Sequence, residues 1–256
     1  MAWDPAQYLK FADHRLRPAI DLLNRIDATN PTSIYDLGAG AGNVTRLLKA
    51  RWPEARITGV DGSKDMLAKA AATVPDVAWQ HADLATWEAP TAADIIYSNA
   101  ALHWLAPHAR IFPTLLSALA RGGVLAVQMP RNFAAPSHAL IAEAARNGPW
   151  RAKLEPLLRP VPVAEPGFYY DVLAAHTAAL DIWETEYLHV LEGDDPVKEW
   201  TKGTWLKPLL DALEEPERSA FEARYAELLR PVYPRRPDGR TLLPFRRLFI
   251  VAKARG

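Results

Sequence analysis

The chain has 256 residues, of which 49% are hydrophobic and 23% are charged. This length and composition are typical of one globular domain that can bury a core, and they exclude intrinsically disordered and fibrous proteins. Thirty basic residues balance thirty acidic residues, which argues against a nucleic-acid partner. The absence of cysteine excludes disulfides, thiolate zinc sites and cysteine nucleophiles.

The start of the chain lacks the basic and apolar pattern of a signal peptide, and no run of about 18 apolar residues occurs. We therefore expect a cytoplasmic protein without a membrane partner. The seven histidines lack the spacing of metal ligands, so no metal is expected. No repeat or linker divides the sequence, which predicts a single domain over residues 1–256.

A predicted amphipathic helix comes first, because Leu16, Ile20, Leu23 and Ile26 recur at helical spacing. Alternating strands and helices follow it. The strands are predicted at 33–37, 56–60, 77–80, 94–98 and 124–129, with helices at 44–51, 63–73 and 111–120. Two later strands are predicted at 181–190 and 246–252. This order predicts an α/β, Rossmann-like fold with a mostly parallel seven-stranded sheet and helices on both faces.

Two segments have a pattern different from the sheet. Residues 196–229 are charged and helical in pattern, so we interpret 191–244 as a helical cap insertion between the last two strands. Ligands of such sheets bind beyond the carboxyl ends of the strands, where an insertion of this size would form a roof. Residues 1–30 are interpreted as an N-terminal helical lid segment.

A glycine-rich loop follows the first predicted strand. Gly38, Gly40 and Gly42 let the backbone turn tightly and approach a ligand. The third glycine comes one residue too early for the dinucleotide pattern, and Asp36 is an unfavourable neighbour for a pyrophosphate. A cationic ligand fits better. S-adenosyl-L-methionine carries a sulfonium and an ammonium but no phosphate, so the loop favours this cofactor over NAD.

Two further aspartates follow the next two strands. Asp61 comes about 20 residues after the loop, where a ribose diol is usually bound, and Asp83 is placed to accept hydrogen bonds from an adenine amino group. A single aspartate at a strand end is more commonly a helix cap or part of a solvated turn. Three of them together with a glycine loop favour cofactor binding.

These residues carry a family resemblance. Through 36–42, Asp61, Asp83 and 94–99 the sequence resembles the class I S-adenosylmethionine-dependent methyltransferases. More narrowly, it is similar to the trans-aconitate methyltransferases at 3–5, 8–9, 17–19, 100–105, 127–130, 169–171, 181–183 and 247–252. The resemblance implies a cytoplasmic enzyme that esterifies one carboxylate of a small polycarboxylate, trans-aconitate. It places the cofactor against Asp36, Gly38, Ala39, Gly40, Asp61, Gly62, Met66, Asp83, Leu84 and Asn99.

The sequence departs from this family at two places. Ala39 and Ala41 stand where relatives often have cysteine and proline, which should leave the loop geometry intact. Trp205 and Lys207 stand where a small residue and an arginine are expected. Lysine keeps the charge of arginine but loses its bidentate fork, so the acceptor preference is left open.

A carboxylate acceptor is already ionised at pH 7, so its methylation needs no general base. The acceptor is expected to contact His103, Trp104, Arg131, Tyr170 and Arg247, and His103 is also the candidate catalytic residue. Residues 230–247 contain six arginines and one acid, which would attract an anion. Each arginine alone is more commonly a paired surface charge, and His103 is equally well explained as an interior histidine.

Three alternatives remain at this stage. In the first, the acceptor is a hydroxyl, amine or carbon of another metabolite, and His103 is the general base. In the second, the protein is a nicotinamide-dependent oxidoreductase with a similar sheet; Asp36 and the glycine spacing argue against this alternative. In the third, the protein binds S-adenosylmethionine without turnover. This alternative stays open because a cofactor pocket alone does not establish catalysis.

Overall fold

The computed structural model describes residues 12–255, so the first part of the expected lid segment lies outside the described residues. The chain forms two compact units. The first, here called the sheet unit, comprises residues 15–130, 162–185 and 247–255. The second, here called the helical unit, comprises residues 131–161 and 186–246, with residues 12–14.

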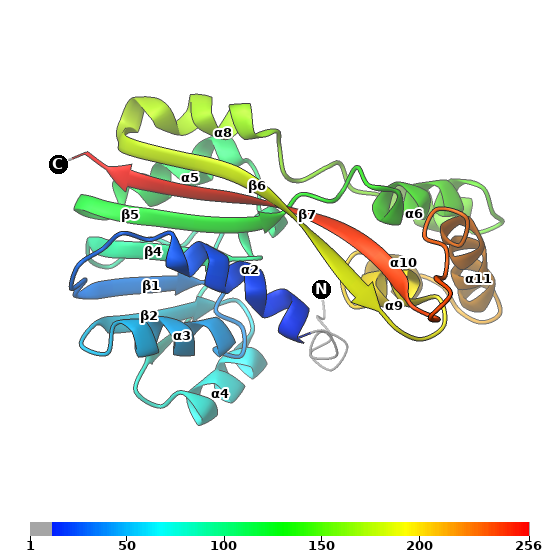
Figure 1. Ribbon diagram of the computed structural model, residues 1–256, viewed down its shortest axis with the longest axis horizontal. Coiled ribbons are helices and arrows are strands. Elements are labelled where there is room, and N and C mark those ends of the chain that lie inside the picture. Colours follow the sequence, from blue (N-terminus) through cyan, green and yellow to red (C-terminus); the bar gives the residue numbers. More distant parts are fainter. Residues whose placement is uncertain (1–11, 256) are drawn as a thin grey trace. The chain divides into compact units, whose positions relative to one another are not determined.

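The sheet unit is built around a seven-stranded sheet (Figure 1). Its strand order is β3-β2-β1-β4-β5-β7-β6. Strands β1 to β5 are parallel to one another, and β7 is antiparallel to β5. The predicted α/β fold with a mostly parallel sheet is confirmed. The bounds are β1 Ser33–Leu37, β2 Arg56–Asp61, β3 Ala78–His81, β4 Ala93–Asn99, β5 Leu119–Pro130, β6 Thr177–Leu191 and β7 Thr241–Ala254.

Helices lie on both faces of the sheet in this unit. Figure 1 shows α2 and α3 in front of the strands and α5 behind them. Polar contacts fix the front face: the Tyr97 hydroxyl donates to the carbonyl of Ala19 in α2 at 2.7 Å, and the Thr45 hydroxyl of α3 donates to Asp36 at 2.6 Å. The helices of this part are α2 Ala12–Asn24, α3 Asn43–Arg51, α4 Lys64–Thr73, α5 His108–Ser117 and α8 Pro166–Leu173.

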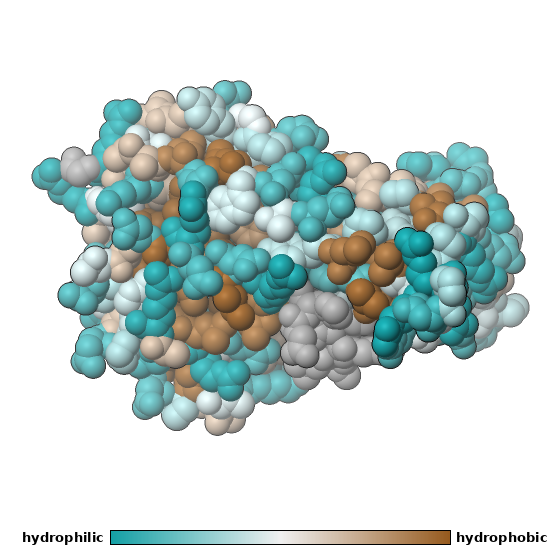
Figure 2. Space-filling model, viewed as in Figure 1, coloured by the Kyte–Doolittle hydropathy of each residue, from teal (hydrophilic) through white to brown (hydrophobic). Residues whose placement is uncertain are grey.

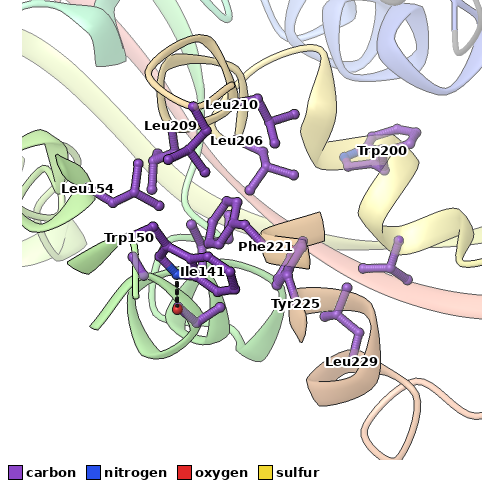
Figure 3. Close-up of a cluster of buried hydrophobic side chains, with 14 of the residues drawn as sticks. Ile141, Trp150, Leu154, Trp200, Leu206, Leu209, Leu210, Phe221, Tyr225 and Leu229 are labelled. Carbon is purple, nitrogen blue, oxygen red and sulfur yellow. Dashed lines mark hydrogen bonds between the residues drawn. The ribbon is translucent and has the colours of Figure 1, made fainter. Parts of the chain in front are cut away.

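The helical unit has a hydrophobic core of its own (Figure 3). Leu154, Leu206 and Phe221 are completely buried in it, and the Trp150 indole N–H donates to the carbonyl of Ala144 at 2.8 Å. Three of its helices lie between β6 and β7 in the sequence, whereas the other two come from 131–161 and were not predicted. The bounds are α6 Pro136–Arg146, α7 Arg151–Leu154, α9 Pro196–Lys202, α10 Lys207–Asp211 and α11 Glu217–Leu229.

One predicted boundary was wrong. The sequence predicts a helix over 111–120 and a strand over 124–129, with Gly122 and Gly123 between them, but α5 ends at Ser117 and β5 already begins at Leu119. Leu119 pairs with Ala93 of β4, and the register shifts just beyond that pair. The two glycines therefore form an irregularity inside a strand, where Gly122 has a positive φ of 72°.

Three further observations concern the described residues. Figure 2 shows apolar side chains gathered over the arrowhead end of the edge strand β6, where Leu188 and Val190 are exposed. Within residues 12–255, no helix has the length and apolar character needed to cross a bilayer. The same part of the chain contains no cluster of three histidine, aspartate or glutamate side chains that would hold a metal ion.

A buried histidine in the helical unit makes its stability depend on pH. His138 lies among the rings of Phe133, Trp205 and Phe245, and burial lowers its pKa to about 4. Its unfolded pKa is about 6.5, so between these values the unfolded chain binds more protons than the folded chain. Stability is therefore lost as the pH falls through this window, by about 3 kcal/mol from this group.

His138→Gln should flatten this dependence, because the variant has no group that titrates there. Chemical denaturation between pH 4 and 7 measures the free energy of unfolding of both proteins. The exposed His176 provides the matched control, and His176→Gln should keep the wild-type slope. An unchanged slope in His138→Gln would show that His138 is not buried in its neutral form.

Candidate active site

The candidate site lies at the carboxyl edge of the parallel strands in the sheet unit. The loop between β1 and α3 is fixed to β2, because the N–H groups of Gly38 and Ala39 both donate to the carbonyl of Val60, at 2.8 and 3.1 Å. Gly38, Gly40 and Gly42 all have positive φ values, from 55 to 81°. The glycine loop therefore has the tight, left-handed turns that its sequence predicted.

Two of these glycines are required by close packing. A Cβ at Gly38 would lie 2.1 Å from the Cβ of Ala101, and one at Gly42 would lie 2.9 Å from the ring of Trp79. At Gly40 the nearest atom is the terminal methyl of Met66 at 3.7 Å. The loop thus packs directly against the turn after β4 and against β3, while a Cβ at its middle glycine would be in ordinary van der Waals contact with Met66.

Asp61 joins the glycine loop to α4. Its two carboxylate oxygens accept hydrogen bonds from the N–H groups of Gly40 and Ser63, each at 2.8 Å. Asp83 is exposed and accepts from the N–H of Ala85 at 2.9 Å. Both aspartates therefore stabilise turns, as the alternative interpretation expects. Each carboxylate oxygen still has a further lone pair for a ligand, so the cofactor roles of both residues stay predictions.

Asp36 is the buried acid of the site. It is 2% exposed, and its carboxylate accepts the Thr45 hydroxyl at 2.6 Å. Burial raises its pKa to about 7; the Thr45 hydrogen bond lowers it, and the negative charge of Asp61 raises it. A nearby cation would stabilise the ionised form and lower this pKa. The structure thus gives a physical basis for the expected cationic ligand.

A short helical turn after β4, η1 Leu102–Trp104, presents two predicted acceptor residues. His103 is buried, Trp104 is 40% exposed, and their ring centroids lie 4.6 Å apart. His108 of α5 anchors this turn, because its Nε2 donates to the carbonyl of Leu102 at 3.0 Å and its Nδ1 accepts from the Tyr169 hydroxyl at 2.7 Å. Burial lowers the pKa of His108, which favours this neutral form.

The anchoring role of His108 was not predicted from the sequence. The histidine has no motif of its own, and its two partners are separated from it by 6 and 61 residues. Only the packing of α5 against α8 brings Tyr169 to it. The residue next to Tyr169, the predicted acceptor residue Tyr170, is 59% exposed on α8.

The remaining predicted acceptor residues belong to different units. Arg247 is buried on β7 of the sheet unit. Arg131 follows β5 directly and belongs to the helical unit, where its N–H donates to the carbonyl of Arg246 at 2.9 Å.

The two residues of the helical unit that depart from the family pattern, Trp205 and Lys207, have partners within that unit. Trp205 packs against Phe133, and Lys207 pairs with Asp211 at 3.1 Å.

The positive charge expected from residues 230–247 is largely balanced by nearby acids. Four arginines pair with acidic side chains that lie between residues 186 and 195, so the stretch is a weaker attractor of anions than its sequence suggests. Arg230 makes two bonds to Asp195 at 2.9 Å, Arg240 contacts Glu192 at 3.0 Å, Arg235 contacts Asp194 at 3.6 Å and Arg246 contacts Glu186 at 3.9 Å.

Near the ends of β4 and β5 two amide side chains have polar atoms without a hydrogen-bond partner. Asn99, a predicted cofactor residue, is half-buried, and its Oδ1 has no hydrogen-bond partner. Gln128 was not predicted as a site residue, although it is completely buried and both its amide atoms lack partners. A glutamine inside the otherwise apolar run 124–129 was the only signal in the sequence.

Comparison with known proteins identifies relatives along the whole chain. Residues 34–123 match the family model described as "Methyltransferase domain". Proteins named trans-aconitate 2-methyltransferase from Azoarcus sp. and Streptomyces avermitilis are 46% and 47% identical, each over 98% of this chain and over 98% and 96% of their own lengths.

A solved phosphoethanolamine N-methyltransferase from Haemonchus contortus, in complex with S-adenosylhomocysteine, has a similar fold. The TM-score is 0.56 at 14% identity, and the match covers 94% of this chain and 53% of that chain. At this identity the likeness concerns the fold alone.

The packing of the glycine loop makes a prediction for stability. Gly38→Ala should lower the free energy of unfolding by about 3 kcal/mol, because the new Cβ combines a strained positive φ with a collision against Ala101. Gly122→Ala is the matched control: Gly122 has a similar φ of 72° but no atom near its Cβ position, so it should cost only about 1 kcal/mol. Equal losses, measured by denaturation without ligand, would contradict the close approach.

Proposed function

Since the chain belongs to the trans-aconitate 2-methyltransferase family, we propose that it transfers a methyl group from S-adenosyl-L-methionine to a carboxylate of trans-aconitate, giving the monomethyl ester. The observation that carries this proposal is the similarity of whole chains. It extends through the helical unit as well as through the sheet unit, which contains the methyltransferase domain. We further propose the cytoplasm as the site of action and a diffusible small polycarboxylate as the partner.

The residues of the glycine loop fit the cofactor. Gly40 is the least closely packed of the three glycines, and a buried acid, Asp36, lies beside the loop. A buried acid suits a ligand that carries positive charges but no phosphate. Asp61, Asp83 and Asn99 would complete the binding site through carboxylate and amide oxygens. When bound, S-adenosylmethionine supplies an electrophilic methyl group attached to a positively charged sulfur.

The acceptor needs positioning more than activation. Its carboxylate is ionised at neutral pH, so an oxygen lone pair forms the new C–O bond as the bond between methyl and sulfur breaks, and no proton moves. The protein must align these atoms and keep out water that would solvate the anion. The His103 imidazole and the buried Arg247 guanidinium are the donors we assign to the carboxylates of the acceptor.

The direct test is product formation by the purified protein. With S-adenosylmethionine labelled in its methyl group and trans-aconitate as acceptor, we expect a labelled monomethyl ester, identified by mass spectrometry and by release of methanol in alkali. At saturating S-adenosylmethionine, kcat should show no rise through a histidine-like pKa, because no base takes part. Turnover of a hydroxyl or amine acceptor and not of trans-aconitate would overturn the proposal, and tight NADH binding would indicate an oxidoreductase.

Cofactor binding should release a proton from Asp36. Near pH 6.5 this carboxyl is mostly protonated in the free protein, since its pKa is about 7, and a bound cation favours the ionised form. The affinity for S-adenosylmethionine should therefore rise as the pH increases from about 6 to about 8. Isothermal titration calorimetry in buffers of different ionisation enthalpy should show up to one proton released at pH 6.5.

Two variants make this prediction specific. Asp36→Asn should bind S-adenosylmethionine more weakly and release no proton from this position. Asp76→Asn, which changes an exposed aspartate in the same unit, should keep both the affinity and the proton release. Wild-type proton release that persists in Asp36→Asn would assign the titration to another group.

A further inference from the structure

Gln128, near the end of β5, has the most unusual polar environment among the described residues. Its side chain is completely buried, and neither the amide nitrogen nor the amide oxygen has a hydrogen-bond partner. Buried polar groups are nearly always paired, because an unpaired group loses its hydrogen bonds to water without replacement. An amide with both atoms unpaired in the free protein therefore indicates a ligand that completes its bonds.

The register of the sheet shows what surrounds Gln128. It lies opposite Asn99 of β4 and opposite Phe249 of β7. Residues in register on neighbouring strands point to the same face of a sheet, and so do residues two apart on one strand. Arg247, two residues from Phe249, therefore shares this face, where it is buried. The Gln128 amide thus lies between a cofactor residue of β4 and a guanidinium of β7.

The same face carries the buried acid of the cofactor site. Asp36 is in register with Tyr97, and Tyr97 is two residues before Asn99. From β1 to β7 the face therefore presents a carboxylate, an amide, a second amide and a guanidinium. Neighbouring strands are about 5 Å apart, so Gln128 is about 10 Å across the sheet from the acid and adjacent to the positive end. This order separates a place for a cation from a place for an anion.

We infer that Gln128 binds the reacting carboxylate of the acceptor, with its Nε2–H group donating to a carboxylate oxygen. This inference rests on the proposed function. A neutral amide suits the reacting group, because that carboxylate loses its charge in the transition state and a tight ion pair would stabilise the reactant more. Arg247, at the next strand, binds a carboxylate that keeps its charge. Gln128 therefore orients the nucleophile without weakening it.

The test uses Gln128→Met, which keeps the size of the side chain but removes both polar atoms. Its melting temperature without ligands should equal or exceed that of the wild type, since an unpaired buried amide is removed. Its affinity for S-adenosylmethionine should be unchanged. Its kcat/KM for trans-aconitate should fall about 10- to 100-fold, as expected for one lost hydrogen bond to a charged group. Gln128→Glu should fall further, because two carboxylates repel each other.

Gln80→Met is the matched control. Gln80 lies in β3 of the same unit and accepts a hydrogen bond from the Trp87 indole at 3.4 Å. The control should lose some stability and keep its kcat/KM, which is the opposite of the result expected for Gln128→Met. A large loss of stability in Gln128→Met would show that the amide has a structural role, and unchanged kinetics would show that it does not contact the acceptor. Either result overturns the inference.

Binding of trans-aconitate in the presence of S-adenosylhomocysteine separates this inference from the proposed function. If the wild type binds or methylates trans-aconitate and Gln128→Met behaves identically, the inference fails while the proposed function stands. If the wild type binds trans-aconitate and the variant does not, the inference is supported whether or not turnover is observed. If the wild type neither binds nor methylates it, the proposed function fails and the inference fails with it.

Discussion

The burial of the Asp36 carboxyl is the constraint on which the rest of the site depends. Removing a carboxylate from water is unfavourable, and the fold offsets this with one hydrogen bond from Thr45, while Asp61 nearby adds repulsion. A carboxyl in this environment is stable either as the neutral acid or beside a cation. A glycine loop beside such an acid suits a ligand with a positive charge, which is the basis of the proposed S-adenosylmethionine site.

Strand pairing arranges acidic, amide and basic side chains in order along one face of the sheet. Parallel pairing of β1, β4 and β5 places Asp36, Asn99 and Gln128 on that face, and the antiparallel strand β7 adds Arg247. Arg247 lies in the middle of β7 and is in register with Pro130, the last residue of β5, so it lies at the carboxyl edge of the parallel strands. A cationic and an anionic ligand can thus bind on one face, because the Asp36 carboxylate and the Arg247 guanidinium are kept apart on different strands.

The sequence predicted those parts of the site that local patterns determine. The glycine spacing and the aspartates at or just beyond the ends of β1, β2 and β3 follow from single strand-loop-helix units, so the loop and Asp61 lie where expected. Gln128 was missed because its neighbours Asn99 and Phe249 are set by long-range strand pairing. The ion pair of Arg230 with Asp195, 35 residues away, could not be predicted from local sequence either, so the positive charge of residues 230–247 was overestimated.

Charge loss in the proposed reaction explains why an amide and a guanidinium would bind different carboxylates of the acceptor. Transfer of the methyl group removes the positive charge of the donor sulfur and the negative charge of the acceptor oxygen together. Full charges placed against the reacting atoms would stabilise reactants more than the transition state. A neutral amide at the reacting carboxylate and a guanidinium at a carboxylate that stays ionised avoid this penalty. The same arrangement holds the ester less firmly than the acid, which favours product release.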